Sequence, residues 1–321
     1  MRGSPKDLAR WAFWVPFREA LDPARPERLR ALYPLWRAQY AAGGAQKQLI
    51  REELQACFGR SDEGLVREAY RIAFRVHLEE LLLGKVGPDT VGHYVVWEGR
   101  ERLDQALGRG KGAVLLLPHA GNIMMMIALL AYSGVPYTQY AARGLAPDEV
   151  AQANPETFGH NRWRSEARRA REDNEDRLPC SFLSLGTSVR ELYRRLGRNE
   201  TVGIGYDGRI GNKFAPFEYL GRTALLNTGP YRIAASTGAA IVPLFNLCPA
   251  EGPNRCQVGQ PLHGDDWRAL ARGSLDQAQA WLRANPSHYG IWLAHARARR
   301  AVDDHPFFVD YAPDERYRRW M

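Results

Sequence analysis

The sequence predicts a mixed α/β fold in which helices flank a largely parallel central sheet, with a helical region in front of it. Three observations lead to this prediction. From Gly92 onward, apolar strand-like runs alternate with helix-like segments, as they do in layered α/β proteins. Residues 113–118 form an unbroken apolar run, which is typical of a strand buried on both faces. The chain has 321 residues, 45% of them hydrophobic, which is enough to build a large core.

The first part of the chain reads as helical, and its clearest helix is expected over residues 63–83. Apolar side chains recur there at helical spacing, as at Leu65, Ala69 and Ile72, with charged residues between them. We therefore expect residues 1–90 to form a helical N-terminal region that packs on the core.

The α/β domain is expected to occupy residues 91–300. Its strands are predicted over 94–97, 113–118, 137–142, 201–206 and 240–247, and its helices over 101–107, 123–132, 161–177, 189–196, 229–237 and 275–284. The last segment, 301–321, is rich in arginine, aspartate and proline. It is expected to be a C-terminal extension on the surface.

The composition is basic, with 44 lysines and arginines against 36 aspartates and glutamates and a formal net charge of +8. This balance favours acidic partners, such as phosphate headgroups, an acidic carrier protein, an anionic membrane surface or nucleic acid. Nucleic acid is the least favoured of these. The arginine-rich stretch over 162–177 also carries acidic residues, and the sequence shows no nucleic-acid-binding motif.

Several other classes of protein are disfavoured. The four cysteines are widely spaced, so we expect neither a disulfide framework nor a zinc site. The histidines show no metal-ligand spacing, and no metal is expected. No apolar run is long enough to cross a membrane, and the run over 11–17 is too short for a signal peptide. A cytoplasmic location is expected.

A histidine, His119, stands where the predicted buried strand ends and the next helix is about to begin. Ligands bind at the carboxyl ends of strands in open α/β sheets, and a helix N-terminus offers free backbone N–H groups. His119 could take a proton from a hydroxyl or an amine, while N–H groups near Gly121 and Asn122 hold an oxyanion. The alternative interpretation is a histidine that is hydrogen-bonded for structural reasons.

Other short segments extend this pattern in order along the chain. They are VWEG from Val96, GKGAVLLLPHAGN from Gly110, YAAR ending at Arg143, VGIGYDGR ending at Arg209, FEYLGRT from Phe217, TGP at 228–230, TGAAIVP at 237–243 and NPSHYGIW from Asn285. Together the series resembles the lipid A biosynthesis acyltransferases, a family of late acyltransferases within the lysophospholipid acyltransferase-like superfamily. The resemblance covers about residues 65–300.

The resemblance implies a glycerolipid acyltransferase-like fold and an acyltransferase activity. In that family an acyl group moves from a thioester, on acyl carrier protein or coenzyme A, to a hydroxyl of a glycolipid. For this chain it implies a hydroxyl or amine acceptor and His119 as general base. It implies no cofactor beyond the acyl-carrier-protein or coenzyme A thioester as co-substrate.

The chain departs from the family at one motif position. The family signature is a histidine followed by an acid, H-x4-D or H-x4-E, but the acid position after His119 holds Met124. Methionine can neither orient an imidazole nor stabilise its charged form. Three explanations remain open. Another carboxylate reaches His119, with Asp207 as the first candidate because it follows a predicted parallel strand, ahead of the weaker candidates Glu191, Glu200 and Glu218. In the second explanation, His119 acts without an acid and is held by Asn122 or a backbone carbonyl. In the third explanation, the protein has lost acyl transfer and has kept a binding or altered role.

Two further sets of residues are candidates for substrate contacts. Arg143 and Arg209 could clamp a phosphate or carboxylate of the donor or acceptor, with ordinary surface ion pairs as the alternative. Met124, Met125 and Ile127 could line an acyl-chain pocket, because methionine adapts to flexible chains. Plain core packing of a buried helix is the alternative for these three.

The acceptor follows least directly from the sequence. Family members that acylate lipid A usually carry an N-terminal membrane anchor, whereas this chain has only Trp11, Phe13, Trp14 and Phe17 as interfacial aromatic residues. We therefore expect either a peripheral protein at the cytosolic face of the inner membrane or one with a soluble acceptor, such as a natural-product intermediate. A non-catalytic acyl- or lipid-binding protein, and a thioesterase or cyclase acting on a carrier-bound intermediate, are the alternatives.

Overall fold

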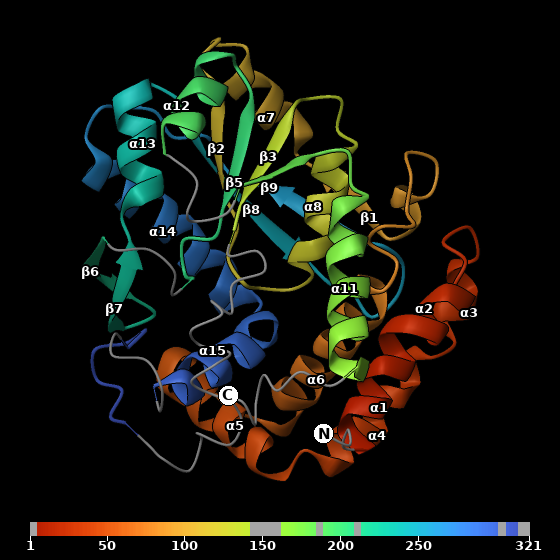
Figure 1. Ribbon diagram of the computed structural model, residues 1–321. Helices are drawn as coiled ribbons and strands as arrows, with labels where there is room; N and C mark the ends of the chain where they lie inside the picture. Colours follow the sequence, from red (N-terminus) through yellow and green to blue (C-terminus); the bar gives the residue numbers. More distant parts are fainter. Residues whose placement is uncertain (1–4, 142–161, 184–188, 209–212, 301–305, 314–321) are drawn as a thin grey trace.

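The computed structural model describes residues 5–141, 162–183, 189–208, 213–300 and 306–313. It confirms the predicted fold class, because a largely parallel seven-stranded sheet lies at the centre and helices flank it (Figure 1). The sheet strands are β1 (Val95–Glu98), β2 (Ala113–Leu116), β3 (Tyr137–Tyr140), β4 (Ser181–Leu183), β5 (Thr201–Ile204), β8 (Ala240–Leu247) and β9 (Asn254–Val258).

The strand order across the sheet is β1-β9-β8-β2-β5-β3-β4. The β8–β9 pair is antiparallel, and the other neighbouring pairs are parallel. Parallel neighbours end at the same edge of a sheet, so the carboxyl ends of β2 and β5 lie side by side there. A separate antiparallel hairpin consists of β6 (Phe214–Tyr219) and β7 (Arg222–Asn227).

Helices cover both faces of the sheet and continue beyond one edge. The N-terminal region contains α1 (Pro5–Ala12), the π-helical turn η1 (Phe13–Phe17), α2 (Arg18–Ala20), α3 (Pro26–Arg30), η2 (Tyr33–Leu35), α4 (Trp36–Ala42), α5 (Gly44–Phe58), α6 (Glu63–Glu80) and η3 (Val91–His93). The later helices are α7 (Arg100–Leu107), α8 (Ile123–Ala131), α11 (Arg162–Asp176), α12 (Arg190–Gly197), α13 (Gly229–Thr237), α14 (Trp267–Ala284) and α15 (Ser287–Arg299).

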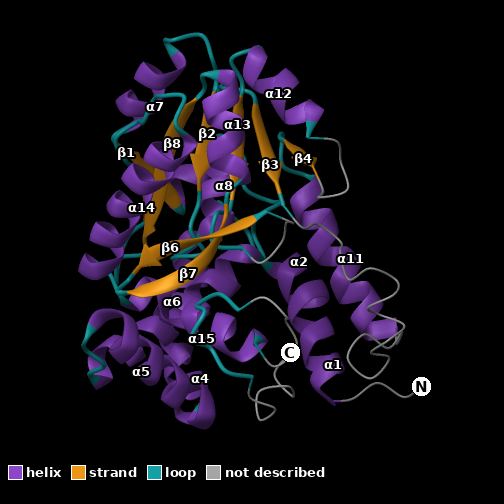
Figure 2. Ribbon diagram, turned by 90° about the vertical axis from the view of Figure 1, so that its left-hand side faces the viewer, coloured by secondary structure: helices purple, strands orange, loops and turns teal. Residues whose placement is uncertain are grey.

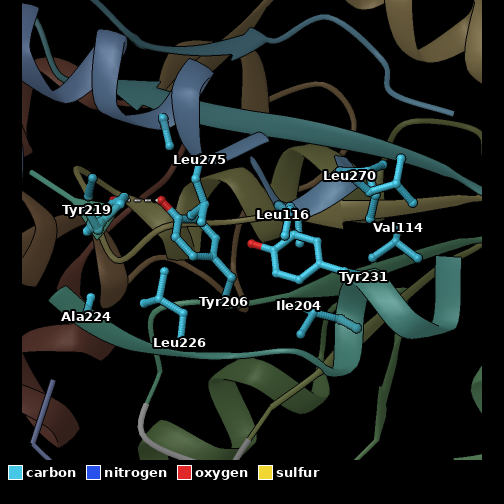
Figure 3. Packing of buried hydrophobic residues seen from close by; sticks show 14 of the residues in the cluster. Val114, Leu116, Ile204, Tyr206, Tyr219, Ala224, Leu226, Tyr231, Leu270 and Leu275 are labelled. Atoms are coloured by element: carbon cyan, nitrogen blue, oxygen red, sulfur yellow. Dashed lines mark hydrogen bonds between the residues drawn. The ribbon is translucent and has the colours of Figure 1, made fainter. Parts of the chain in front are cut away.

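The two-residue period of β2 divides the core between the two faces of the sheet. Val114 and Leu116 point into one buried cluster, which includes side chains of α13 and α14, whereas Leu115 points into the other, which includes side chains of α7 and α8. Figure 3 shows the first cluster, in which the hydroxyls of two buried tyrosines, Tyr206 and Tyr219, meet at 2.9 Å. β2 is therefore buried on both faces, as its apolar run predicts.

Helices α4, α5, α6 and α15 gather beyond one edge of the sheet (Figure 2). α6 and α15 pack against each other and against α5 through a small buried cluster that includes Ile50, Leu54, Ala69 and Ala294. A side chain at Gly290 of α15 would lie 3.2 Å from Ile50 and 3.3 Å from Ala69, so the glycine permits this close packing. This bundle places one face of α6 and one face of α15 next to the carboxyl ends of β2 and β5.

Several elements were not expected from the sequence. They are β4, the β6–β7 hairpin, β9 and α15, and α14 begins eight residues earlier than its predicted start, at Trp267 instead of at 275. Part of the C-terminal extension also differs from the expected surface segment. Phe307 and Phe308 are buried, because their rings pack into the hydrophobic core together with residues of the β6–β7 hairpin. Phe308 also forms an antiparallel bridge with Ala224 of β7.

Among the described residues, the helices are too short or too polar for any of them to cross a lipid bilayer.

Candidate active site

The register of β2 and β5 brings His119 and Asp207 together. Leu116 is paired with Ile204 in this parallel ladder. His119 and Asp207 each follow three residues later, so both side chains leave the sheet at the same edge. The Nδ1 atom of His119 lies 2.7 Å from Oδ1 of Asp207. A carboxylate 88 positions away in sequence thus occupies the place beside the imidazole.

The Asp207 carboxylate is completely buried, and three donors satisfy it. Besides the imidazole, its Oδ2 atom accepts the backbone N–H of His119 at 2.9 Å and the hydroxyl of Tyr289 at 2.8 Å. Burial, followed by the charge of Asp207, raises the pKa of Tyr289, so this phenol stays protonated and donates. An ionised carboxylate can only accept hydrogen bonds, so a neutral imidazole beside it would carry its proton on Nδ1 and keep the lone pair of Nε2 free.

The His119 ring is held on its remaining sides as well. Trp292 stacks flat on it, with ring centroids 4.1 Å apart and an angle of 12° between the planes. A Cβ atom at Gly205 would lie 3.1 Å from Cε1 of His119, and one at Gly208 would lie 3.6 Å from it. The side chain is nevertheless 35% exposed. The segment after β5 and helix α15 thus orient the ring and leave part of it accessible.

Sequence reasoning assigned no role to Tyr289 and Trp292, although both belong to the NPSHYGIW segment. They are three residues apart on α15, so they lie on the same helix face. From that face Tyr289 reaches Asp207 and Trp292 reaches His119. The spacing of a tyrosine and a tryptophan by three residues after a proline was the available signal.

The backbone groups predicted to hold an oxyanion already have acceptors. The N–H of Gly121 donates to the carbonyl of His288 at 3.1 Å, and the N–H of Asn122 donates to Oδ1 of Asn246 at 2.9 Å. The Oδ1 atom of Asn122 caps α8 by accepting the N–H of Met125. The structure therefore does not support the predicted oxyanion role of these two residues and shows them as structural anchors of the loop.

A glycine is required at position 121. Its φ is +66°, in the left-handed region. A Cβ atom there would lie 2.3 Å from the carbonyl oxygen of Asn246. The close approach of strand β8 thus requires a glycine at this position.

A cavity of about 510 Å³ opens beside His119, between α6 and α15. α6 contributes four apolar residues at helical spacing, and α15 contributes a matching face next to Trp292. These residues are Ala69, Ile72, Ala73 and Val76 of α6, with Ile291, Ala294 and Ala298 of α15. Polar side chains, including His77, Arg171, His288 and His295, also line it. The cavity is mostly apolar along its length, as a site for a flexible hydrocarbon chain would be.

His288, which lines this cavity, is held as a neutral imidazole. Its Nε2 atom accepts the backbone N–H of Cys248 at 2.9 Å. Burial, reinforced by the positive charge of Arg71, lowers the pKa of His288 to about 4. The uncharged ring keeps this part of the cavity wall free of positive charge at neutral pH.

The three residues expected to form an acyl-chain pocket lie mainly in the core. Met125 and Ile127 are buried, and Met124 packs partly buried against the same cluster. The residue of α8 that lines the cavity is Ile123. The structure thus places these three side chains where the core-packing alternative put them, and acyl contact by them stays a prediction.

The other predicted site residues divide into two groups. Arg143 and Arg209 lie outside the described residues. The three aromatic residues expected at a membrane surface, Trp11, Trp14 and Phe17, are half-buried. Trp11 donates a hydrogen bond to Glu166 of α11, and Phe17 stacks on Phe13. The guanidinium of Arg171 lies 5.9 Å from the ring centroid of Trp14. Membrane contact through these aromatic residues stays a prediction. The described residues contain no cluster of three or more histidine, cysteine or acidic side chains that could hold a metal ion.

The weaker acid candidates have other surroundings. Glu191 and Glu200 pair with arginines of α12 and the turn after it, principally Arg195. Glu218 lies on β6 of the hairpin. The structure shows no contact between these three carboxylates and His119.

The chain is similar in sequence to known bacterial acyltransferases. The profile described as bacterial lipid A biosynthesis acyltransferase matches residues 35–297. A phosphatidylinositol mannoside acyltransferase of Mycobacterium tuberculosis is 28% identical over 215 residues, which are 63% of this chain and 62% of that protein. Another, from Mycolicibacterium smegmatis, is 26% identical over 272 residues, which are 80% of this chain and 83% of that protein. The chain thus spans less than two thirds of the length of the Mycobacterium tuberculosis relative.

Proposed function

The chain belongs to the bacterial lipid A biosynthesis acyltransferase family, and on that premise we propose that it moves an acyl group from a thioester donor to a hydroxyl or amine of an acceptor. One observation carries the proposal. The imidazole of His119, hydrogen-bonded to buried Asp207 at 2.7 Å, is partly exposed at the wall of a mostly apolar cavity. This arrangement supplies an oriented base next to space for an acyl chain.

In the proposed reaction His119 Nε2 takes the proton of the acceptor hydroxyl or amine as the freed oxygen or nitrogen attacks the thioester carbonyl carbon. Asp207 stabilises the imidazolium that forms, as an orienting carboxylate does in other base–acid pairs. The tetrahedral intermediate then collapses, the C–S bond breaks, and the imidazolium returns the proton to the leaving thiolate. The products are the acylated acceptor and a free thiol.

The apolar faces of α6 and α15 would hold the acyl chain. Three of the lining residues are alanines, Ala69, Ala73 and Ala294, and their small side chains leave room in the cavity for an acyl chain. The developing oxyanion would lie near the first turn of α8, because Ile123 at its start lines the same cavity and a helix N-terminus carries partial positive charge. We propose an acyl-carrier-protein or coenzyme A thioester as donor and a lipid as acceptor.

The test is product formation from defined substrates. Purified protein would be incubated with labelled acyl-coenzyme A or acyl-carrier-protein and with a glycolipid or amine acceptor. Transfer that His119→Ala abolishes, and that His263→Ala preserves, would support the proposal, since His263 is an exposed histidine that does not line the cavity. Full transfer by His119→Ala would refute the role of the base.

The same assay separates the alternatives. Thioester loss without acylation of any acceptor would indicate a thioesterase or cyclase. Saturable binding of the thioester without turnover would indicate an acyl-binding protein.

A further inference from the structure

A second buried carboxylate, Glu79 near the end of α6, collects four hydrogen bonds. Its Oε1 atom accepts from Nε of Arg75 at 2.8 Å and from the hydroxyl of Tyr33 at 2.6 Å. Its Oε2 atom accepts from the side-chain amides of Asn122 at 2.7 Å and Asn254 at 2.6 Å. Glu79 is completely buried and does not line the cavity, so it cannot touch a substrate bound there.

The charge of Glu79 is matched inside the protein. Arg75, itself 1% exposed, is fixed by the carbonyls of Pro249 and Gly252, each at 2.9 Å. Burial, reinforced by the charge of Glu79, raises the pKa of Tyr33, so its phenol remains a donor. A buried carboxylate with all its acceptor positions filled is rigid, because moving it would leave several buried donors unpaired.

One of the four donors belongs to the loop that carries His119. Asn122 comes three residues after His119, and its amide group joins two structures. Its Nδ2 donates to Glu79, and its Oδ1 accepts the N–H of Met125 at 3.1 Å. At the other end of the loop, Asp207 accepts both the backbone N–H and the Nδ1–H of His119. Two carboxylates on different elements therefore clamp the two ends of the four-residue loop.

We propose that Glu79 is a positioning residue, which through Asn122 sets the place of the His119 loop and so the direction of Nε2 toward the cavity. This inference rests on the proposed function of His119. Because reactions that depend on an aligned base are sensitive to displacements of about 1 Å, loss of the clamp should lower kcat roughly 10- to 100-fold. Most of the apolar cavity wall comes from α6 and α15 and not from this loop, so the KM for the thioester should not change.

The sharpest variant is Asn122→Ser. Serine can still cap α8 through its hydroxyl, but it lacks the amide that reaches Glu79. Glu79 keeps three of its four donors, so the fold should persist. Glu79→Gln is the complementary change. The double variant Glu79→Gln/Asn122→Ser should be as active as the less active of the two single variants, because both substitutions remove the same link.

Glu53→Gln is the matched control. Glu53 is also a buried carboxylate that accepts from an arginine and a tyrosine, Arg222 and Tyr311, but it has no contact with the loop. A thermal shift comparable to that of Glu79→Gln with unchanged kcat would separate positioning from general destabilisation.

The outcomes are distinct. A lowered kcat with unchanged KM in Asn122→Ser, and no further loss in the double variant, would support the inference. Wild-type kcat in folded Asn122→Ser, or losses that multiply in the double variant, would overturn it. If Glu79→Gln does not fold, Asn122→Ser decides alone. Activity that survives His119→Ala would overturn the proposed function instead, so the two failures can be told apart.

Discussion

Replacing Asp207 with asparagine should abolish most activity by moving a single proton. The substitution keeps the shape of the side chain but turns one oxygen into an amide donor. Of the two orientations, the one with the amide nitrogen at Oδ2 would face two donors, the backbone N–H of His119 and the Tyr289 hydroxyl. The backbone donor cannot reverse its role, so the amide nitrogen should sit at Oδ1, facing the imidazole.

In that orientation the amide donates to Nδ1 of His119. The imidazole must then carry its proton on Nε2, where the acceptor's proton has to be received. The variant therefore presents the wrong tautomer and also lacks the charge that stabilises the imidazolium. Analogous aspartate-to-asparagine changes in base–carboxylate pairs lower kcat by roughly 10⁴-fold. We expect a fall of at least about 10³-fold here, which corresponds to about 4 kcal/mol of transition-state stabilisation.

The measurement is the single-turnover rate of acyl transfer at saturating thioester, with the melting temperature recorded in parallel. Tyr289→Phe serves as the graded comparison, because it removes one hydrogen bond to Oδ2 and leaves the Oδ1 contact in place. It should cost less than about tenfold, in line with about 1 kcal/mol for one hydrogen bond. Asp207→Asn with a rate within threefold of the wild type, alongside an inactive His119→Ala, would refute the reasoning on the tautomer.

Three further predictions concern the ring, the cavity and acid stability. Gly205→Ala places a Cβ atom 3.1 Å from the His119 ring. The variant should lower kcat about tenfold, because the base is displaced, with little change in melting temperature. An unchanged kcat would contradict the inference that Gly205 fixes the position of the His119 ring. Ala73→Leu should fill part of the cavity wall and raise KM for long acyl thioesters more than for short ones; equal effects on both would argue against chain binding there. His288 has its pKa lowered to about 4 by burial, so the unfolded chain binds its proton first as pH falls below about 6.5. The free energy of unfolding should therefore fall by up to roughly 3 kcal/mol between about pH 6.5 and pH 4 because of this histidine. His288→Asn should remove this part of the fall, as measured by urea unfolding at successive pH values.

The order of strands and helices could be predicted where each element carries its own pattern. The prediction for α13 agrees with the structure at both ends, since Pro230 at its start and Gly238 after it are local signals. β9 carries no such signal. Its sequence, NRCQV, has two polar side chains that remain partly or fully exposed, and its pairing with β1 and β8 decides its conformation.

The part of the site that the sequence could predict is the pair of residues that follow the ends of strands. Both His119 and Asp207 terminate apolar runs, which is why sequence reasoning placed them at one edge of the sheet. The remaining parts depend on contacts between distant segments. The amides of Gly121 and Asn122 are occupied by His288 and Asn246, which lie more than 120 residues away in the chain. No local pattern could show that those donors were already used.

The absence of an acid at Met124 does not by itself indicate lost activity, because the imidazole can receive its carboxylate by two routes. An acid at the fifth position after the histidine reaches it along the first turn of a helix. An acid on the neighbouring strand reaches it through sheet register, and the pairing of Leu116 with Ile204 keeps His119 level with Asp207. In this chain Asp207 is held in addition by the backbone N–H of His119 and the phenol of Tyr289. If Asp207, three residues after β5, orients His119 as proposed, the first turn of α8 does not need an acid, and a partly buried methionine can pack there against the core.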